Sequence, residues 1–289
     1  MTNPFSGTGF DMVAMTAAVN KLPNLYNRTA AIFPDNGIST TSVMVEQLNG
    51  TLNIIRSRPR GAAPDKNIAD KRALRSFVIP HIPIDDVLLP DDYQNVRSFG
   101  SEDAAETAAN VMARKLQRMK NSIDQTREYL RMGALKGIIL DADATTLYNL
   151  YNVFGITAKT VDFVLDDEDT DIRGKCAEVI RHIEDYLLGE SMTAVHCLVS
   201  ASFYDDLVVH PRVEKAYQYY MANNQSLAGD YRRRFEFGGV VFEEYRATWT
   251  DHDGTARAAI VAGEGHAFPE GTSNTFETVV APGRKLSAL

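Results

Sequence analysis

The sequence predicts a protein of the α+β class, and three observations support this prediction. Residues 102–132 contain neither Pro nor Gly, which allows one long helix. Runs rich in β-branched and aromatic residues lie both before and after this stretch, for example at 41–48 and 194–200. Strands and helices do not alternate in the regular order that is typical of a doubly wound parallel sheet.

Composition indicates a soluble chain with a sizeable core. The chain has 289 residues, of which 44% are hydrophobic, and a formal net charge of −8. No window approaches the apolar length of a membrane span, and the N-terminus lacks a basic leader. The two cysteines, Cys176 and Cys197, fall in apolar-periodic segments and are expected to be core thiols in a reducing cytoplasm. The net charge argues against general affinity for nucleic acid.

The first part of the chain predicts an arm followed by a projecting β-loop. Residues 1–36 show no sustained period and are interpreted as an extended arm. Two β-prone runs, 41–48 and 51–58, are joined by Asn49-Gly50, which suits a tight hairpin turn. A third run, 72–84, is confined by its prolines to a sheet edge or an extended arm. We therefore predict a long, basic, two-stranded loop.

The longest predicted element is the helix at 102–132. Ser101 can cap it, and the acidic residues that follow Ser101 complement the positive end of the helix dipole. Its apolar residues recur at spacings of three and four and form one narrow stripe: Met112, Leu116, Met119, Ile123 and Leu130. We expect this stripe to be buried against a sheet, with the helix lying across that sheet like a spine.

The second half predicts helices and strands in succession. Ile172, Cys176 and later apolar residues recur at helical spacing through 171–188, and 194–200 reads as a buried strand. A helical stretch follows that is broken at His210-Pro211. Residues 234–263 are expected to form an antiparallel meander, with turns at Gly238-Gly239 and Asp253-Gly254.

One stretch resembles the start of an enzyme. "GIILDADATTL" at 137–147 is similar to the first motif of haloacid dehalogenase phosphatases, in which Asp141 would be the nucleophile and Asp143 the acid/base. The later motifs such an enzyme needs do not follow in order, and the stretch comes after a long helix rather than in the first strand. We interpret both aspartates as turn caps, and a phosphatase using Asp141 is a remote alternative.

Other chemistries have less support. The six histidines are dispersed without metal-ligand spacing, and "DHDG" at 251–254 is explained by a hairpin turn. The sequence contains no GxSxG, Walker A or GxGxxG motif. We therefore assign no catalytic, metal or cofactor-binding residue, expect no cofactor, and predict that the protein is not an enzyme.

Three stretches together resemble the lambda-like major capsid protein E family of tailed phages. They are 132–156, the Arg-rich approach and strands at 231–246, and 258–282. The resemblance extends over about 37–282, and the three stretches are specific in combination. In this comparison Asp141 and Asp143 match a structural turn.

The resemblance implies the Hong Kong 97-like fold with an N-terminal arm, an extended β-loop, a peripheral domain and an axial domain. The corresponding ranges are an arm at 1–36, the β-loop at 37–98, the peripheral domain with its spine helix at 99–160, the axial domain at 161–262, and a return to the peripheral domain at 263–289. Members usually continue beyond Pro282 with further strands. We therefore expect the last segment to be incomplete and assembly by this chain alone to be impaired.

The implied function is structural. Copies would form pentamers and hexamers of an icosahedral head, assembled in the cytoplasm of a host bacterium around double-stranded DNA that is bound without sequence specificity. Implied partners are scaffold, portal and decoration proteins, with no membrane. A cellular nanocompartment shell of the same fold is the alternative.

Charge patterning suggests how copies would meet. Between Arg56 and Arg75, seven basic residues stand against two acidic ones, whereas acidic residues collect at 85–92 and 162–171. We hypothesise that the basic residues contact an acidic segment of an adjacent subunit. The alternative is that these charges only solvate an exposed loop. The candidate contact residues are Arg56, Arg58, Arg60, Lys66, Lys71, Arg72 and Arg75 on one side, and Asp166, Asp167, Glu168 and Asp169 on the other.

Overall fold

The protein is described by a computed structural model that covers residues 28–49, 71–92, 108–187, 190–216, 234–251, 253–273 and 275–282. Helices and strands both contribute to the fold, which confirms the α+β class. No helix within these ranges is long and apolar enough to cross a membrane.

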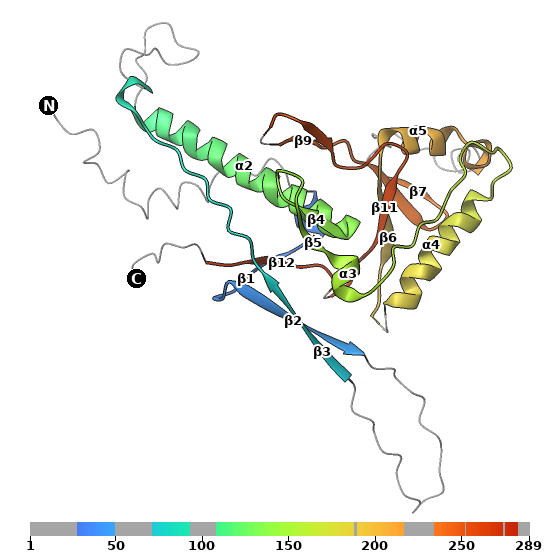
Figure 1. The fold of residues 1–289 in the computed structure, drawn as a ribbon. Coiled ribbons are helices and arrows are strands. Elements are labelled where there is room, and N and C mark those ends of the chain that lie inside the picture. Colours follow the sequence, from blue (N-terminus) through green and yellow to red (C-terminus); the bar gives the residue numbers. More distant parts are fainter. Residues whose placement is uncertain are drawn as a thin grey trace, which may run out of the picture.

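A two-stranded ribbon projects from the body of the molecule (Figure 1). It consists of β2 (Ser42–Asn49) and β3 (Lys71–Val78), which pair antiparallel over their full length. The predicted projecting loop is therefore present, and its described strands are β2 and β3. The predicted hairpin partner at 51–58 lies outside the described residues. Beyond β3 the chain is extended and runs beside the long helix to a short 3-10 helix, η3 (Pro90–Asp92).

The long helix, α2 (Ala108–Lys136), is the spine that the sequence predicted. Its 29 residues give a length of about 44 Å. The predicted start at 102 lies outside the described residues, but the predicted end at 132 is too early, because the helix continues through Gly133. A Cβ at Gly133 would lie 2.9 Å from the carbonyl oxygen of Ile138. This glycine lets the next strand pack closely on the helix, and Gly137, with φ +80°, ends the helix instead.

The predicted burial of the α2 stripe is wrong. All five stripe residues are only partly buried, and the buried positions of α2 include three charged side chains: Asp124, Glu128 and Arg131. Ile123 and Leu130, two members of the stripe, line an open groove instead. Glu128 and Arg131 can occupy the buried face because other segments bring polar partners to them, whereas Asp124 Oδ2 is buried without a hydrogen-bond partner.

Two small sheets pack around α2. β4 (Ile138–Leu140) and β5 (Thr146–Asn149) form an antiparallel hairpin that leads into a short helix, α3 (Leu150–Phe154). β1 (Asp35–Gly37) pairs in parallel with β12 (Thr278–Val280), so that the two ends of the described chain meet on this helix. Another 3-10 helix, η2 (Thr29–Ala31), precedes β1.

A second lobe contains a four-stranded sheet in the order β11–β6–β8–β7. The strands are β6 (Ala194–Val199), β7 (Phe235–Phe237), β8 (Val240–Glu244) and β11 (Gly265–Glu270). Two helices, α4 (Ile172–Tyr186) and α5 (Ala201–Val209), pack on it. The predicted helix at 171–188, the buried strand at 194–200 and the break at His210-Pro211 are confirmed.

The predicted meander at 234–263 is only partly correct: its turns and two antiparallel strand pairs are present, but the two pairs belong to different sheets. Gly238, Gly239 and Gly254 have positive φ as expected. However, β8 pairs in parallel with β6, and β9 (Thr248–Thr250) and β10 (Ala256–Ala258) form a separate hairpin. Turn signals describe only neighbouring strands, so they cannot show that an earlier strand occupies the place beside β8.

Candidate functional site

The structure describes only part of the predicted basic surface. Arg56, Arg58, Arg60 and Lys66 lie outside the described residues. The backbones of Lys71 and Arg72 belong to β3 at the outer end of the described ribbon, but their side chains are not described. Nearer the body, the guanidinium carbon of Arg75 lies 5.5 Å from the ring centroid of Phe154 on α3, a cation–π contact that helps attach the ribbon.

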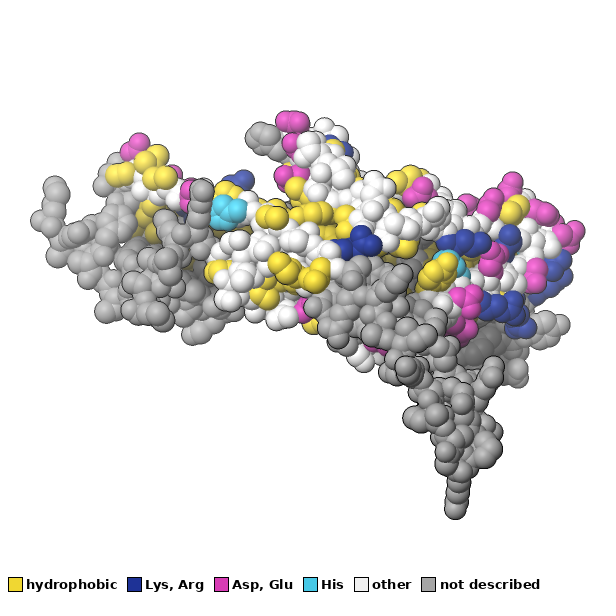
Figure 2. All heavy atoms as spheres, turned by 60° about the horizontal axis from the view of Figure 1, so that its bottom comes forward, with side chains coloured by type: hydrophobic (Ala, Val, Ile, Leu, Met, Phe, Trp, Pro, Cys, Tyr) yellow, Lys and Arg dark blue, Asp and Glu magenta, His cyan; other side chains and the backbone are white. Residues whose placement is uncertain are grey.

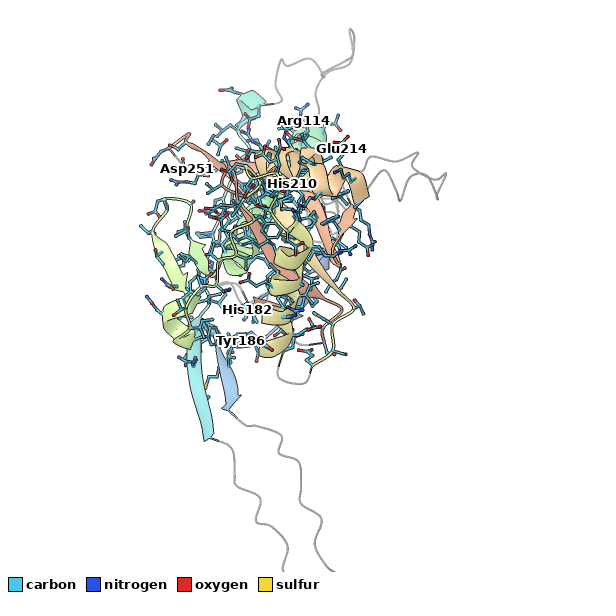
Figure 3. The ribbon with its side chains drawn as sticks, turned by 90° about the vertical axis from the view of Figure 1, so that its right-hand side faces the viewer. Arg114, His182, Tyr186, His210, Glu214 and Asp251 are labelled. Atoms are coloured by element: carbon cyan, nitrogen blue, oxygen red, sulfur yellow. The ribbon has the colours of Figure 1, made fainter. Side chains whose placement is uncertain are left out.

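The predicted acidic surface is exposed. Asp166, Asp167, Glu168 and Asp169 all lie on the surface of the loop that leads into α4. The backbone of this loop is well anchored: the Thr170 hydroxyl donates to the Val164 carbonyl at 3.0 Å, and a ring nitrogen of His210 lies 3.0 Å from the Asp167 carbonyl. Figure 3 shows His210 on the same lobe as α4. The loop therefore presents carboxylates on a defined backbone.

The other acidic segment, 85–92, is already paired within the chain. Lys115 on α2 lies 3.2 Å from Asp86 and 2.9 Å from Asp92, and it also donates a hydrogen bond to the Val87 carbonyl. The hydrogen bond from Lys115 lowers the pKa of Asp92. These contacts attach the extended segment to the spine helix, so 85–92 is less available to another subunit than 162–171.

Within the described residues, the ribbon and the acidic loop 162–171 do not meet. The described ribbon points away from the lobe that carries α4 (Figure 1). Within the described residues, Asp169 contacts a local cation instead, the guanidinium of Arg212 at 3.3 Å. The predicted pairing between the basic residues and this loop stays a prediction.

Sequence analysis missed an apolar surface at the base of the ribbon. A groove of about 1000 Å³ runs between α2, β3, the β4–β5 hairpin and β12. Nearby on the ribbon, Met44, Leu74 and Val78 are each more than 60% exposed. Figure 2 shows hydrophobic side chains gathered across this face, with charged side chains concentrated at the α4 end. Large exposed apolar surfaces of this kind are typical of protein interfaces. The alternation of apolar residues in 74–84 is the sequence pattern that could have predicted this apolar surface.

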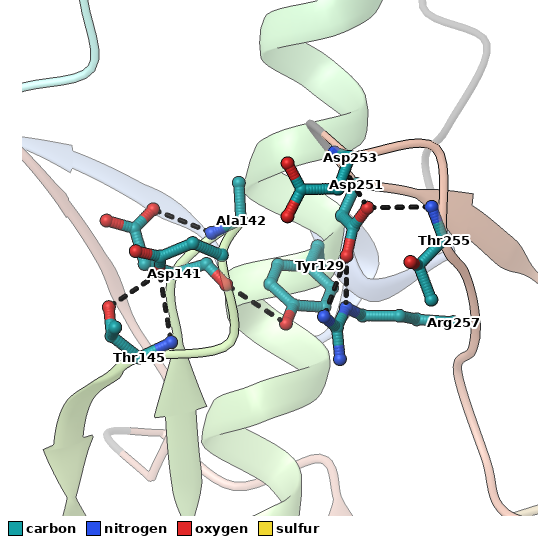
Figure 4. A network of polar contacts seen from close by, with 9 residues as sticks. Tyr129, Asp141, Ala142, Thr145, Asp251, Asp253, Thr255 and Arg257 are labelled. Carbon is teal, nitrogen blue, oxygen red and sulfur yellow. Dashed lines mark hydrogen bonds and ion pairs between the residues drawn. The ribbon is translucent and has the colours of Figure 1, made fainter.

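The stretch that resembles a phosphatase motif is a structural turn (Figure 4). Asp141 Oδ1 accepts from the Ala142 amide at 2.7 Å, and Asp143 Oδ1 accepts from both the amide and the hydroxyl of Thr145 at 2.9 and 2.6 Å. The bonds from Thr145 lower the pKa of Asp143. Both carboxylates therefore cap the β4–β5 connection, as predicted.

The facing β9–β10 hairpin is built in a similar way. Asp251 accepts from the Thr255 amide at 2.8 Å and pairs with Arg257 at 2.7 Å. Tyr129 on α2 lies between the two turns and donates to the Asp141 carbonyl at 3.3 Å. In the part of the chain that the structure describes, no group of three His, Cys, Asp or Glu side chains is arranged to hold a metal ion.

Comparisons with known proteins agree on one family. The family model for phage major capsid protein E matches residues 11–287. The major capsid protein of Pseudomonas phage KPP10 is 31% identical over 301 residues, covering 98% of this chain and 86% of that protein. The major capsid protein of Salmonella phage Felix O1 (isolate Felix O1-VT1) is 28% identical over 311 residues, covering 96% and 84%.

A solved structure shows a more distant likeness. It is a crystal structure of a phage-related protein from Bordetella bronchiseptica RB50, with 11% sequence identity and a TM-score of 0.44 over 87% of this chain and 74% of that one.

Proposed function

This chain belongs to the phage major capsid protein E family, and from that premise we propose how its copies build a shell. It is a structural subunit of a bacteriophage capsid, as its relatives in two tailed phages are. The family implies self-assembly into a shell, a place in the virion and a non-enzymatic role.

The finer proposal is a Hong Kong 97-like subunit. In it, 1–36 forms the N-terminal arm, 37–98 the extended β-loop, 99–160 the peripheral domain and 161–262 the axial domain, and 263–289 returns to the peripheral domain. The observation that carries this proposal is the β2–β3 ribbon, which projects from the body with apolar side chains exposed. Such exposure is costly for an isolated chain and becomes favourable when a neighbour covers it.

The proposed assembly is an icosahedral head made of pentamers and hexamers. Scaffold, portal and decoration proteins are proposed partners, and assembly is proposed to occur in the cytoplasm of the host bacterium. Double-stranded DNA fills the shell without sequence-specific binding. The formal charge of −8 suits this container, because a strongly basic wall would retain phosphate and resist packaging and release.

We propose that the basic residues of 56–75 contact the acidic loop 162–171 of an adjacent subunit. The intrachain pairing of Lys115 with Asp86 and Asp92 favours 162–171 over 85–92 as the partner. The carboxylates of Asp166 and Glu168 are exposed and ready for such a contact. A closed shell needs both surfaces on every copy, and one chain supplies both.

Charge reversal tests this pairing. We expect the triple variant Arg58→Glu, Arg60→Glu and Arg72→Glu to remain folded by circular dichroism but to form no shells in negative-stain electron microscopy. A second variant, Asp166→Lys and Glu168→Lys, should fail in the same way, because it also leaves like charges facing each other.

Combining the two sets in one chain should restore shells, because it restores opposite charges at the contact. A control triple variant on exposed residues away from both surfaces, Arg118→Glu, Arg181→Glu and Arg246→Glu, makes the same change in net charge as the first triple variant. Normal shells from the first triple variant would refute the pairing. Equal loss in the control would show that net charge, rather than a specific contact, controls assembly.

A phosphatase assay tests the non-enzymatic role. We expect no hydrolysis of p-nitrophenyl phosphate with Mg²⁺, because both aspartates of the candidate motif are used as turn caps. Activity that disappears in Asp141→Asn would contradict this expectation.

A further inference from the structure

A cluster of polar side chains, mostly buried, joins the spine helix to the four-stranded sheet. It draws residues from α2, from β6, β8 and β11 of the sheet, and from the chain just after β8. Two further members, Arg28 and Thr29, come from the end of the proposed N-terminal arm. The cluster consists of Arg28, Thr29, Glu128, His196, Glu243, Tyr245 and Glu270.

Thr29 satisfies most of the hydrogen-bonding capacity of Glu128. Glu128 lies on α2 and is only 1% exposed. Its carboxylate accepts from the Thr29 amide at 3.0 Å, from the Thr29 hydroxyl at 2.5 Å and from the Tyr245 hydroxyl at 2.8 Å. Thr29 itself is fully buried. A buried carboxylate needs such donors, and two of these three bonds come from one residue of the arm.

Arg28 provides hydrogen bonds in a similar way to a carboxylate of the four-stranded sheet. Its Nε lies 2.8 Å from both carboxylate oxygens of Glu243 on β8, and its Nη2 lies 2.5 Å from one of them. The Glu243 side chain is 16% exposed. Removing the partner of a largely buried charge is strongly unfavourable, because that charge is left desolvated and unpaired.

His196 on β6 extends the cluster toward β11. Its Nδ1 lies 3.5 Å from Arg28 Nη2, and its Nε2 lies 2.9 Å from Glu270, although the latter contact lacks the direction of a hydrogen bond. Burial lowers the pKa of His196, and the charge of Arg28 lowers it further while Glu270 and Glu243 oppose this shift. Because the imidazole is neutral, it does not repel the guanidinium of Arg28 and does not compete with it for the carboxylate of Glu243.

We propose that Arg28 and Thr29 are positioning residues that set the angle between α2 and the four-stranded sheet. With both in place, Glu128 and Glu243 are satisfied while the two lobes are packed together. Without them, Glu128 keeps only the hydrogen bond from Tyr245 and Glu243 loses its guanidinium partner, so both carboxylates are better solvated when the lobes separate or rotate. The path of the arm and the shape of the subunit are therefore coupled. This inference rests on contacts within one chain and does not depend on the proposed pairing between subunits.

Two spin labels can measure the angle in the full-length chain. Exposed positions for them are Arg118 on α2 and Val209 at the end of α5, each replaced by Cys. The native thiols Cys176 and Cys197 are buried, so they should stay unlabelled. The distance distribution is read by double electron–electron resonance, with labelled chain diluted in excess unlabelled chain so that only intrachain distances contribute.

We expect one narrow distribution for the parent chain. In the variant Arg28→Gln with Thr29→Val, the distribution should shift or broaden while circular dichroism stays unchanged. Replacing the same residues conservatively, as Arg28→Lys with Thr29→Ser, should return most of the narrow peak, because the charge and the hydroxyl are retained. The control Lys159→Gln breaks a 2.9 Å ion pair with Glu178 away from the cluster and should leave the peak unchanged.

The proposal is overturned if the Arg28→Gln, Thr29→Val variant is folded and keeps the parent distribution. If that variant does not fold, the distance distribution of Thr29→Val alone is measured instead, because this change removes the hydroxyl donor to Glu128 with little change in charge or volume. A folded Thr29→Val variant that keeps the parent distribution would also overturn the proposal. A shift of equal size in Lys159→Gln would also overturn it, since the effect would then not be specific to the cluster.

Discussion

Arg131 and Arg127 offer a matched pair of perturbations, because both lie on α2 and both approach the same carboxylate. Arg131 Nη2 lies 2.6 Å from Asp35 Oδ1, and the Arg131 side chain is 7% exposed. Its Nε also donates to the Thr278 hydroxyl at 2.9 Å, so one side chain holds both β1 and β12 on the helix. Arg127 lies 3.8 Å from Asp35 and is 38% exposed.

The expected magnitudes follow from this geometry. Arg131→Met loses the paired hydrogen bond to the Asp35 carboxylate and the hydrogen bond to the neutral Thr278 hydroxyl, but it keeps much of the packing of the side-chain stem. Asp35 is 52% exposed and regains water, so the cost of leaving it unpaired is small. The free energy of unfolding should fall by about 2–3 kcal/mol. Arg127→Met removes only a surface ion pair and should cost about 0–1 kcal/mol.

Urea unfolding of the purified variants, followed by circular dichroism, measures the difference. In a double-mutant cycle with Asp35→Asn, Arg131 should couple to Asp35 more strongly than Arg127 does. If Arg127→Met is as destabilising as Arg131→Met, burial and hydrogen-bond geometry do not decide the strength of these contacts, and the reasoning fails.

Three further predictions concern thiols, histidines and backbone strain. Burial raises the pKa of Cys176 and of Cys197 to about 12, so at about pH 8 only about one thiol in ten thousand is ionised. An aromatic disulfide reagent should therefore react with these thiols only after urea is added. Rapid reaction of the native chain would contradict this. Burial also lowers the pKa of His196 and of His266 below the usual 6.5, so the unfolded chain takes up protons first as the pH falls. Their contribution to stability should be complete above about pH 6.5 and decline below it, and thermal unfolding should show a smaller loss on acidification for His266→Asn than for the parent chain. Val164 has φ +47°, a conformation that Asn tolerates better than a β-branched residue does. In urea unfolding, Val164→Asn should therefore raise the free energy of unfolding by about 1 kcal/mol. A loss of stability would exclude strain at this position.

Local sequence signals were sufficient where an element is specified by its own residues. The helical spacing that begins at Ile172 and Cys176 correctly predicted α4, and both side chains are buried. The short polar side chains of Asp141 and Asp143 predicted a turn, and each forms the expected hydrogen bonds with nearby backbone. Hydrogen bonds of this range depend on residues only a few positions apart, so the sequence shows both partners together.

The candidate contact surface was predictable only in part. Clustering of like charges identified 162–171, and the structure shows these carboxylates exposed. Charge clustering could not show that 85–92 is less available for a contact than 162–171, because the cation that pairs with Asp86 and Asp92 is Lys115 on another element. The predicted basic residues from Arg56 to Lys66 lie outside the described residues, and their role stays a prediction.

The sequence by itself determined the α+β class, the long α2 helix and the family, because each depends on patterns that are continuous along the chain. Only the tertiary structure decided which face of α2 is buried. Apolar periodicity would place Glu128 and Arg131 on the exposed face of the helix. Both are buried because Thr29 and Asp35, about a hundred residues earlier in the chain, form a hydrogen bond and an ion pair with them. Burial of a charge depends on its partners, and the folded chain alone brings those partners together.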